Sequence, residues 1–437
     1  MHHRPNRRLP LLGLGLLLAA TLAACGGGVD AEEDDHDHEH TVIETAGRLV
    51  SAEAGSKTLR IHDLDSATGT VTASVTADST VTALYASPGG RYAVAMQRTG
   101  DLVQFVDGGV WQEDHGDHLH DYRQAPALLA WKITGPRPTH FDRQAGKQAA
   151  IFMDGNSAAS PVQNASVRLI TDASIASASE AASLNLSVPI HGLAEPVDNK
   201  LLVVHRAADA PDTLPTHLTL FQRSGSGFTE TRRLDTRCNG MHGSFSSGAY
   251  TVTGCTDGML VVRHTGTATV SDLKVPTAVR VGTVAGHPRL PGHFIGYGNE
   301  GVAPAPVTTR FFALDAQSGT ASAWAPQGWS SGRVVRALSF DRTGQRVFLL
   351  DDQGTLVVAQ RQGGAWAPLV RAAAVIPAMP SAAPWPAFAT NEARDEIYLT
   401  DPAARQLVVI NSSTGAVTAR RDLGFVPSYL TWTGIAR

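Results

Sequence analysis

The sequence predicts an all-β protein, and within that class an eight-bladed β-propeller that follows a polar leader. Short runs of β-branched and apolar residues recur along the chain between Gly, Asp, Asn and Ser turns, which is typical of strands. No long stretch has helical periodicity, apart from a turn near Ala173–Ala182. The β-rich pattern repeats about every forty to fifty-five residues, the length of a four-stranded propeller blade.

Three segments show the repeat most clearly, and they are Leu84–Val106, Ala337–Val358 and Phe388–Ile410. Each contains a short strand, a turn, an apolar strand, a second turn and another apolar strand. We expect inner strands to begin near eight positions, which are Leu84, His140, His191, His242, Thr283, Leu338, Phe388 and Leu430. Seven blades is the alternative, if one repeat is divided wrongly.

The two ends of the repeat region complete each other. The last β-rich run, Ser428–Thr433, has no chain after it to complete a blade, and the first, Gly47–Val71, has no inner strand before it. Pairing the two runs in one blade closes the ring and leaves no sheet edge exposed. We therefore assign residues 42–437 to the propeller.

Residues 1–24 are predicted to be a lipoprotein-type signal peptide. Arg4, Arg7 and Arg8 precede an apolar run, Leu9–Ala24, which is too short to span a membrane comfortably. The run ends in Leu-Ala-Ala-Cys at Cys25, which resembles a bacterial lipobox, where the chain is cut before the cysteine and the thiol is acylated. The alternative is an ordinary secretory peptide followed by a chance cysteine. Both interpretations take the protein out of the cytoplasm, and the lipobox predicts a membrane-anchored lipoprotein facing the periplasm.

Residues 25–41 are expected to form a flexible leader. Its segment Glu32–His40 contains no apolar residue, so it cannot join a core and should be disordered without a ligand. His36, His38 and His40 alternate with carboxylates there, a composition typical of metal loading. The alternative is an acidic tether that is merely solvated.

Charge and cysteine content limit the function classes. The 437 residues carry a formal charge of −4, and removing residues 1–24 takes away three arginines and no acid, which gives −7. This mild acidity argues against nucleic-acid binding, and we expect a monomer. Cys238 and Cys255 remain after processing, and in an oxidising compartment an isolated pair is most simply a disulfide. Thiolate metal ligands are the alternative.

A histidine-rich loop, Trp111–Asp121, contains the ligand types that Zn²⁺ accepts. Its imidazoles and carboxylates belong to His115, His118, His120, Glu113, Asp114, Asp117 and Asp121. His118 and His120 are two residues apart, so an extended backbone places both on one face. A polar surface loop that is rich in histidine by chance is the alternative.

A second set of histidines follows the repeat itself. His140, His191 and His242 are each 51 residues apart and lie at the start of an expected inner strand, so three adjacent blades should direct them toward one mouth of the channel. If the loop folds over that mouth, one four-coordinate site could use both groups. His293 is a further 51 residues along but precedes an apolar middle strand, which places it outside the channel. We expect surface or structural roles for the remaining histidines, which are His62, His205, His217, His264 and His287.

In combination these motifs resemble the AztD-like family, the periplasmic zinc metallochaperones that serve a zinc ABC transporter. The resemblance rests on E-D-H-G-D-H-L-H from Glu113, T-H-F-D from Thr139, H-G at His191, and C-N-G-M-H-G from Cys238 followed by G-C-T-D-G from Gly254. It implies a β-propeller without catalytic activity that binds zinc and passes it to the transporter's solute-binding protein. A lipid anchor at Cys25 departs from the freely soluble form of the family.

Two function classes follow from these residues. In the first, a chaperone captures zinc at the leader and holds it at His115, Asp117, His118 and His120 together with the channel histidines. In the second, a metal-dependent propeller hydrolase of the lactonase type uses the metal to activate water. No nucleophile motif, H-E-x-x-H motif or phosphate-binding loop supports an enzyme. A propeller used only for protein binding leaves the histidine clusters unexplained.

Overall fold

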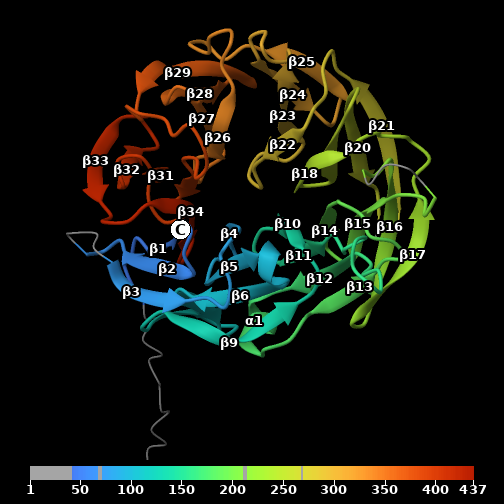
Figure 1. Cartoon of the computed structure of the whole chain (residues 1–437), viewed down its shortest axis with the longest axis horizontal. Helices are drawn as coiled ribbons and strands as arrows, with labels where there is room; N and C mark the ends of the chain where they lie inside the picture. Colours follow the sequence, from blue (N-terminus) through green and yellow to red (C-terminus); the bar gives the residue numbers. More distant parts are fainter. Residues whose placement is uncertain (1–41, 67–70, 210–213, 267–268) are drawn as a thin grey trace, which may run out of the picture. The chain divides into compact units, whose positions relative to one another are not determined.

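The computed structural model describes residues 42–66, 71–209, 214–266 and 269–437. In these ranges the chain forms eight four-stranded antiparallel sheets, arranged as blades around a central channel (Figure 1). The predicted fold class and the count of eight blades are confirmed, and the alternative of seven blades is wrong. The predicted processing site at Cys25 and the leader histidines His36, His38 and His40 lie outside the described residues.

Each blade begins with an inner strand at the channel and ends with an outer strand at the rim. Blade 1 contains β4 (Ala83–Ala86), β5 (Tyr92–Gln97), β6 (Leu102–Asp107) and β9 (Ala127–Thr134). Blade 2 contains β10 (Pro138–Gln144), β11 (Gln148–Met153), β12 (Ser166–Ile170) and β13 (Ala182–Asn185). Blade 3 contains β14 (Ala194–Val197), β15 (Lys200–His205), β16 (His217–Ser224) and β17 (Gly227–Arg233). Blade 4 contains β18 (His242–Ser247), β19 (Tyr250–Cys255), β20 (Gly258–His264) and β21 (Val270–Pro276).

The remaining blades continue the same order. Blade 5 contains β22 (Thr283–Gly286), β23 (His293–Glu300), β24 (Thr308–Asp315) and β25 (Thr320–Trp324). Blade 6 contains β26 (Val335–Phe340), β27 (Arg346–Asp351), β28 (Thr355–Gln362) and β29 (Ala365–Ala374). Blade 7 contains β30 (Phe388–Thr390), β31 (Glu396–Asp401), β32 (Gln406–Asn411) and β33 (Val417–Asp422). Blade 8 joins β34 (Pro427–Thr433) to β1 (Arg48–Glu53), β2 (Thr58–Asp63) and β3 (Val71–Thr76).

Blade 8 closes the ring as the sequence predicts. Strand β34 pairs antiparallel with β1, with Arg48 opposite Thr433 and Ser51 opposite Leu430. Trp432 is buried in the core of this blade, and its indole Nε1–H donates to the Ala46 carbonyl at 2.8 Å. The chain ends are therefore joined by a backbone ladder and by a buried side chain.

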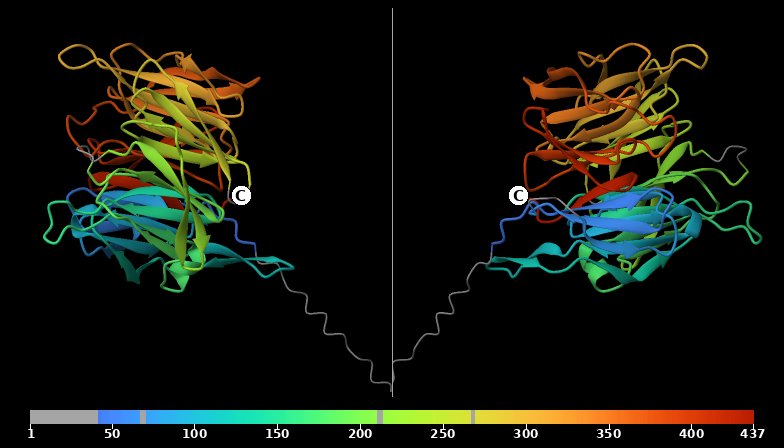
Figure 2. Two further views of the ribbon diagram at one scale, coloured as in Figure 1. Left: turned by 90° about the vertical axis from the view of Figure 1, so that its right-hand side faces the viewer. Right: turned by 60° about the vertical axis from the view of Figure 1, so that its left-hand side comes forward.

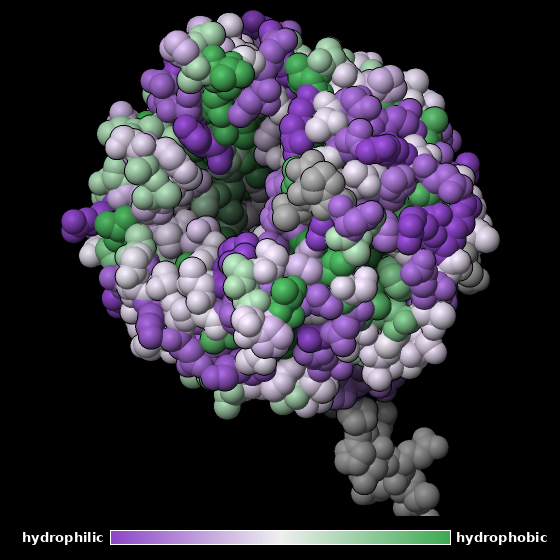
Figure 3. Space-filling view, turned by 45° about the vertical axis from the view of Figure 1, so that its right-hand side comes forward, coloured by the Kyte–Doolittle hydropathy of each residue, from purple (hydrophilic) through white to green (hydrophobic). Residues whose placement is uncertain are grey.

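The core lies between neighbouring blades, because each sheet is covered on both faces. Residues at both faces of the second strands are buried, as in β11, where all six are buried, and β5, where all six are buried as well. A strand covered on both faces needs a continuous apolar run in place of an alternating one. The apolar middle strands of the repeat therefore mark the interior of the ring. The ring itself surrounds a hollow with hydrophobic residues visible in its depth (Figure 3).

The direction of the strands defines two mouths of the channel. Inner strands begin at what we call the start mouth and end at the turn mouth, where a tight turn leads into the second strand. Third strands run in the same direction as inner strands, so they also end at the turn mouth. A two-stranded hairpin, β7 (Val110–Asp114) and β8 (Leu119–Arg123), follows the third strand β6 and projects from that side of the ring (Figure 2).

The two short helices are minor features of the fold. The 3₁₀ turn η1 covers Arg98–Gly100, and α1 covers Asp172–Ala176, which overlaps the segment where the sequence predicts a helical turn. Thr171 and Ser174 form a reciprocal capping box at the start of α1. None of the helices in the described ranges has the length and apolar character needed to cross a lipid bilayer.

Cys238 and Cys255 form the expected disulfide, so the thiolate alternative is wrong. Their Cα atoms are 5.1 Å apart, and their sequence separation is 17. Cys238 lies in the connection that leads to β18, and Cys255 ends β19. The bond therefore fixes the start of the inner strand of blade 4 to the end of its second strand.

Deleting the last ten residues, Ser428–Arg437, should open the ring. The deletion removes β34 with buried Trp432 and exposes the edge of β1, so it should cost more than the roughly 3–5 kcal/mol of one buried aromatic side chain. Thermal unfolding followed by circular dichroism measures the loss. Tyr429→Ala is the matched control, because Tyr429 lies in the same strand with an exposed side chain. If the truncated chain unfolds at the same temperature as the full chain, the pairing of β34 with β1 does not stabilise the ring.

Candidate metal centre

Three imidazoles converge at the start mouth of the channel. His140 lies in β10, His191 lies just before β14, and His242 is the first residue of β18. One nitrogen from each ring lies within 4.8 Å of the other two, and the ring centroids are 5.0, 5.5 and 5.6 Å apart. We call these residues the triad. The repeat spacing of 51 residues thus corresponds to one ring position on blades 2, 3 and 4.

Irregular backbone directs these side chains into the channel. The pairing of β10 with β11 shifts register between Pro138 and His140, and that of β18 with β19 shifts between His242 and Ser244. Such bulges occur where a strand must re-aim a side chain. The shift precedes His140 in blade 2 and follows His242 in blade 4, so each of these two histidines lies directly beside an irregularity of its strand.

A glycine follows two of the three histidines because the space beside them is already filled. A Cβ at Gly192 would lie 2.1 Å from Cγ2 of Val204. Gly243 has φ of +64°, and a Cβ there would lie 2.7 Å from the carbonyl oxygen of Gly282. Only glycine therefore fits after His191 and His242.

Hydrogen bonds orient two of the rings. Nδ1 of His242 lies 2.8 Å from the carbonyl oxygen of Gly282, and a carbonyl can only accept, so Nδ1 carries the proton. Nδ1 of His191 lies 2.9 Å from Oδ2 of Asp154 and donates to it in the same way. When Nδ1 alone carries the proton, Nε2 of each ring keeps a lone pair for a metal ion. Partners of this kind hold metal-binding histidines in the correct tautomer and orientation.

Asp154 follows β11 and is buried, with only 6% of its surface exposed. Burial acts to raise its pKa, but the hydrogen bond and charge of His191 and the charge of Arg98 outweigh burial and lower it. Arg98 Nη1 lies 2.9 Å from Oδ2 of the same carboxylate. Asp154 therefore remains ionised, and it links blades 1, 2 and 3 through one side chain.

His140 faces the other two rings most closely. Its Nε2 lies 3.5 Å from Nε2 of His191. Burial, reinforced by the neighbouring His191 and His242, lowers the pKa of His140 to about 4. The ring is therefore neutral at physiological pH, which is the state in which an imidazole binds a metal ion.

The hairpin β7–β8 carries a second histidine cluster. The ring centroids of His115, His118 and His120 are 5.3 to 6.4 Å apart. Nδ1 of His118 lies 2.7 Å from Oδ1 of Asp117, and Nε2 of His115 lies 3.2 Å from the Tyr122 hydroxyl. Nδ1 of His120 is buried and forms no hydrogen bond with the described residues.

The hairpin does not fold over the triad, contrary to the expectation of one shared site. It follows a third strand and therefore leaves the ring at the turn mouth, whereas the triad lies at the start mouth. Contacts of the hairpin agree with this placement, because Asp121 accepts from the Ile43 N–H at 2.8 Å and pairs with Arg437 near the C-terminus. Within the described ranges, the triad alone brings three His, Cys, Asp or Glu ligand atoms within 4.8 Å.

The other histidines lie mostly where the sequence indicates. His293 begins the second strand β23 and lies outside the triad. His62 is buried in β2, with Nε2 3.1 Å from Oγ of Ser51. His287 is the exception, because it lines a cavity in the channel instead of serving only the surface or the core. His287 lies in a turn after β22, and no motif around it in the sequence predicts this role.

Fold and site together define an eight-bladed β-propeller with a three-histidine cluster of the kind that holds a transition metal. No protein-family model matches the chain. The zinc chaperone AztD of Citrobacter koseri is 29% identical over 184 residues, which is 42% of this chain and 41% of that protein. The matched segment thus spans less than half of the relative's length.

Solved structures show the same architecture. The crystal structure of Citrobacter koseri AztD and that of apo AztD both align with a TM-score of 0.70 and 22% identity over 89% of this chain, covering 99% and 98% of theirs. Dihydro-heme d1 dehydrogenase NirN aligns with a TM-score of 0.57 and 12% identity over 90% of this chain and 76% of its own. The resemblance to AztD-like proteins that the motifs indicate is confirmed in sequence similarity and in fold.

The metal-free protein should lose stability as pH falls from about 6.5 to about 4. His140 has a pKa of about 4 when folded, against about 6.5 when unfolded, so the unfolded chain binds the extra proton in this window. The stabilisation is therefore complete above about pH 6.5 and declines toward pH 4. Urea unfolding at several pH values measures the slope.

His140→Asn removes one of the titrating groups and should reduce that slope, while His264 and His287, whose pKa values burial also lowers to about 4, should keep part of it. His293→Asn is the matched control, because it removes a histidine from a second strand outside the triad. If the pH dependence of stability is unchanged in His140→Asn, this buried imidazole does not contribute to the loss of stability at low pH.

Proposed function

We propose that this chain is a periplasmic zinc chaperone that holds one zinc ion at the triad and passes it to the solute-binding protein of a zinc ABC transporter. The observation that carries the proposal is the convergence of His140, His191 and His242 with nitrogens within 4.8 Å of one another. The zinc chaperone AztD of Citrobacter koseri, which is similar in sequence and fold, supports the choice of zinc. Imidazole ligands alone would also suit copper or nickel.

Three imidazoles leave one position of a tetrahedral zinc ion for another ligand. Each triad side chain is half-buried at a channel mouth, so that fourth position is open to solvent or to a partner. A receiving protein can then add its own ligand before the triad releases the ion. An incomplete ligand set thus suits delivery better than permanent storage.

The hairpin is proposed as a second, separate zinc site of lower affinity. It offers His115, Asp117, His118 and His120, of which His115 and Asp117 are exposed, and its three imidazoles do not bring their nitrogens as close together as those of the triad. The leader histidines His36, His38 and His40 are proposed to load zinc in the same way. Neither group would share an ion with the triad.

We further propose that the mature protein begins at acylated Cys25 and acts from a membrane surface as a monomeric lipoprotein. The disulfide between Cys238 and Cys255 supports an oxidising compartment such as the periplasm. A membrane anchor would keep the chaperone close to its transporter. Mass spectrometry of the mature protein tests both the cleavage and the lipid.

An enzymatic role has weaker support. Metal-assisted hydrolysis needs a general base and a substrate pocket beside the metal. Asp154, the carboxylate at the triad, is already engaged by His191 and Arg98. The large cavity of the channel is lined by none of the triad residues. We therefore propose no catalytic activity.

His191→Ala should weaken zinc binding by at least about a hundredfold, because it removes one of three ligands at the ion. Asp154→Asn should cost about ten- to a hundredfold, the usual effect of losing a partner that orients a metal-binding histidine. His293→Ala is the matched control and should bind zinc like the parent chain. Competition titration with a zinc chelator measures all three, and circular dichroism checks the fold.

If His293→Ala loses zinc while His191→Ala keeps it, the triad is not the zinc centre.

A hairpin variant, His118→Ala with His120→Ala, should retain the tight zinc ion of the triad, since the two groups lie at opposite mouths. It should lose a second, weaker zinc ion and slow the transfer of zinc to the solute-binding protein. Zinc titration with stopped-flow transfer measures both effects. Loss of the tight ion in this variant would mean that hairpin and triad form one site after all.

The matched control replaces His205 and His217, which face each other across β15 and β16, with alanine. The same transfer assay on a chain without Glu32–His40 tests the loading role of the leader.

A further inference from the structure

The channel contains a cavity of about 730 Å³ that is separate from the triad. All eight inner strands contribute to its lining, together with turns of the turn mouth such as Pro88–Gly90 and His287–Arg289. The triad residues are not part of that lining. Its volume lies in the range of sites for small organic molecules.

Arg143 of β10 places a positive charge in this cavity. Its hydrogen bond to the described residues is a long one of 3.4 Å from Nη1 to the carbonyl oxygen of Ser87, and no carboxylate of these residues lies within ion-pair distance of the guanidinium. Burial lowers its pKa, although the charges of Glu392 and Asp172 oppose that effect. The guanidinium therefore has unused donors, and no carboxylate of the described residues pairs with it directly.

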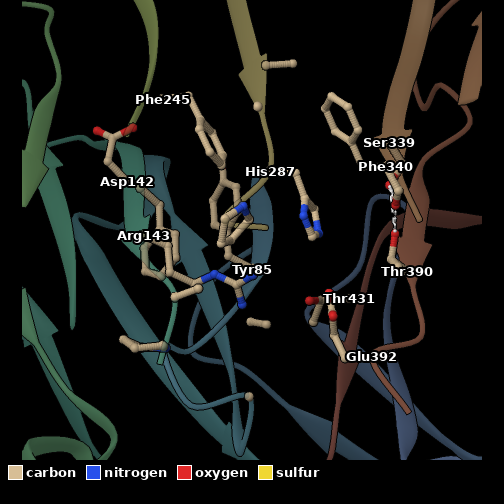
Figure 4. Close-up of a pocket in the computed structure, with 18 of the residues that line it drawn as sticks. Tyr85, Asp142, Arg143, Phe245, His287, Ser339, Phe340, Thr390, Glu392 and Thr431 are labelled. Atoms are coloured by element: carbon tan, nitrogen blue, oxygen red, sulfur yellow. Dashed lines mark hydrogen bonds between the residues drawn. The ribbon is translucent and has the colours of Figure 1, made fainter. Parts of the chain in front are cut away.

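His287 supplies a neutral donor to the same cavity. Its Nδ1 accepts a hydrogen bond of 3.2 Å from the backbone N–H of Arg289, so the proton of the neutral ring lies on Nε2. Burial lowers the pKa of His287 to about 4, so the ring is neutral at physiological pH. Arg143 and His287 come from different blades and extend into one hollow (Figure 4).

Glu392 adds a negative charge to the cavity. Its carboxylate forms no hydrogen bond or ion pair with the described residues, and burial raises its pKa against the opposing charges of Arg143, Arg289 and Arg342. Figure 4 shows Glu392 at the same hollow as His287. Arg143 and Glu392 thus face one space without pairing with each other.

Aromatic side chains form the apolar part of the wall. The rings of Tyr85 and Phe141 stack with centroids 4.9 Å apart, and Phe245 and Phe340 also line the cavity. Unpaired charges of opposite sign beside an aromatic wall match a ligand that carries both charges and an apolar group.

We propose that this cavity binds a small zwitterion of the amino-acid type with an apolar side chain. The ligand carboxylate would accept from the Arg143 guanidinium and from Nε2–H of His287, and its ammonium group would donate to Glu392. The side chain would pack on Tyr85 and Phe141. This site is independent of zinc, because it lies at the other mouth and shares no residue with the triad.

Isothermal titration of the mature chain with L-phenylalanine, phenylacetate and phenethylamine tests the proposal. Phenylacetate lacks the ammonium group and phenethylamine lacks the carboxylate, so each should bind at least about tenfold more weakly than L-phenylalanine. Glu392→Gln should abolish the preference over phenylacetate, and Arg143→Gln should abolish the preference over phenethylamine. His191→Ala should leave all three affinities unchanged.

Arg310→Gln and Glu300→Gln are the matched controls, because these two residues pair with each other at an exposed site away from the cavity. Equal affinity of the parent chain for phenylacetate and L-phenylalanine would show that the ammonium group is not recognised, which would overturn the proposal of a zwitterionic ligand and leave a site for a simple anion. The absence of saturable binding of L-phenylalanine at millimolar concentration would overturn the proposal outright. Both results are obtained with the parent chain, so they hold even if a variant fails to fold.

Discussion

The antiparallel pairing of β34 with β1 is the contact on which the rest of the structure depends. In this blade a strand from the C-terminal end of the described chain pairs with strands near its N-terminal end, which converts a row of blades into a closed ring. Closure sets the angle between neighbouring blades, and that angle sets how closely equivalent residues of adjacent inner strands approach. The triad lies at equivalent positions of three adjacent blades, and all eight inner strands line the charged cavity, so both depend on this ladder. Leu430, Thr431 and Trp432 of the ladder line the cavity directly.

Much of this arrangement was predictable because a propeller repeats in sequence as it does in space. The spacing of 51 residues placed His140, His191 and His242 at one ring position, and an unfinished first and last blade predicted the closure. The same reasoning separated His293 from the triad, since it directly precedes an apolar second strand. The spacing of the repeats therefore predicts which residues lie at the same depth along the channel on adjacent inner strands.

Other features carry no such signal. The hairpin was expected above the triad, yet an insertion after a third strand leaves the ring at the opposite mouth, and only the full strand order shows this. Asp154 and Gly282 orient the triad through contacts between blades, which depend on backbone geometry that a local pattern does not encode. Arg143, His287 and Glu392 come from three different blades, and each resembles an ordinary surface residue in the sequence until the ring brings them together.

His140 and His242 are 102 residues apart in sequence, yet one ion could join them. No fragment shorter than two whole blades contains the complete ligand set, so an unfolded chain cannot offer it. The free energy with which the ion binds to the folded site therefore adds to the free energy of unfolding of blades 2, 3 and 4. Zinc binding and folding are thermodynamically linked, so the zinc-loaded protein should resist proteolysis and heat better than the empty protein. A quality-control protease could then distinguish the two forms by their stability alone.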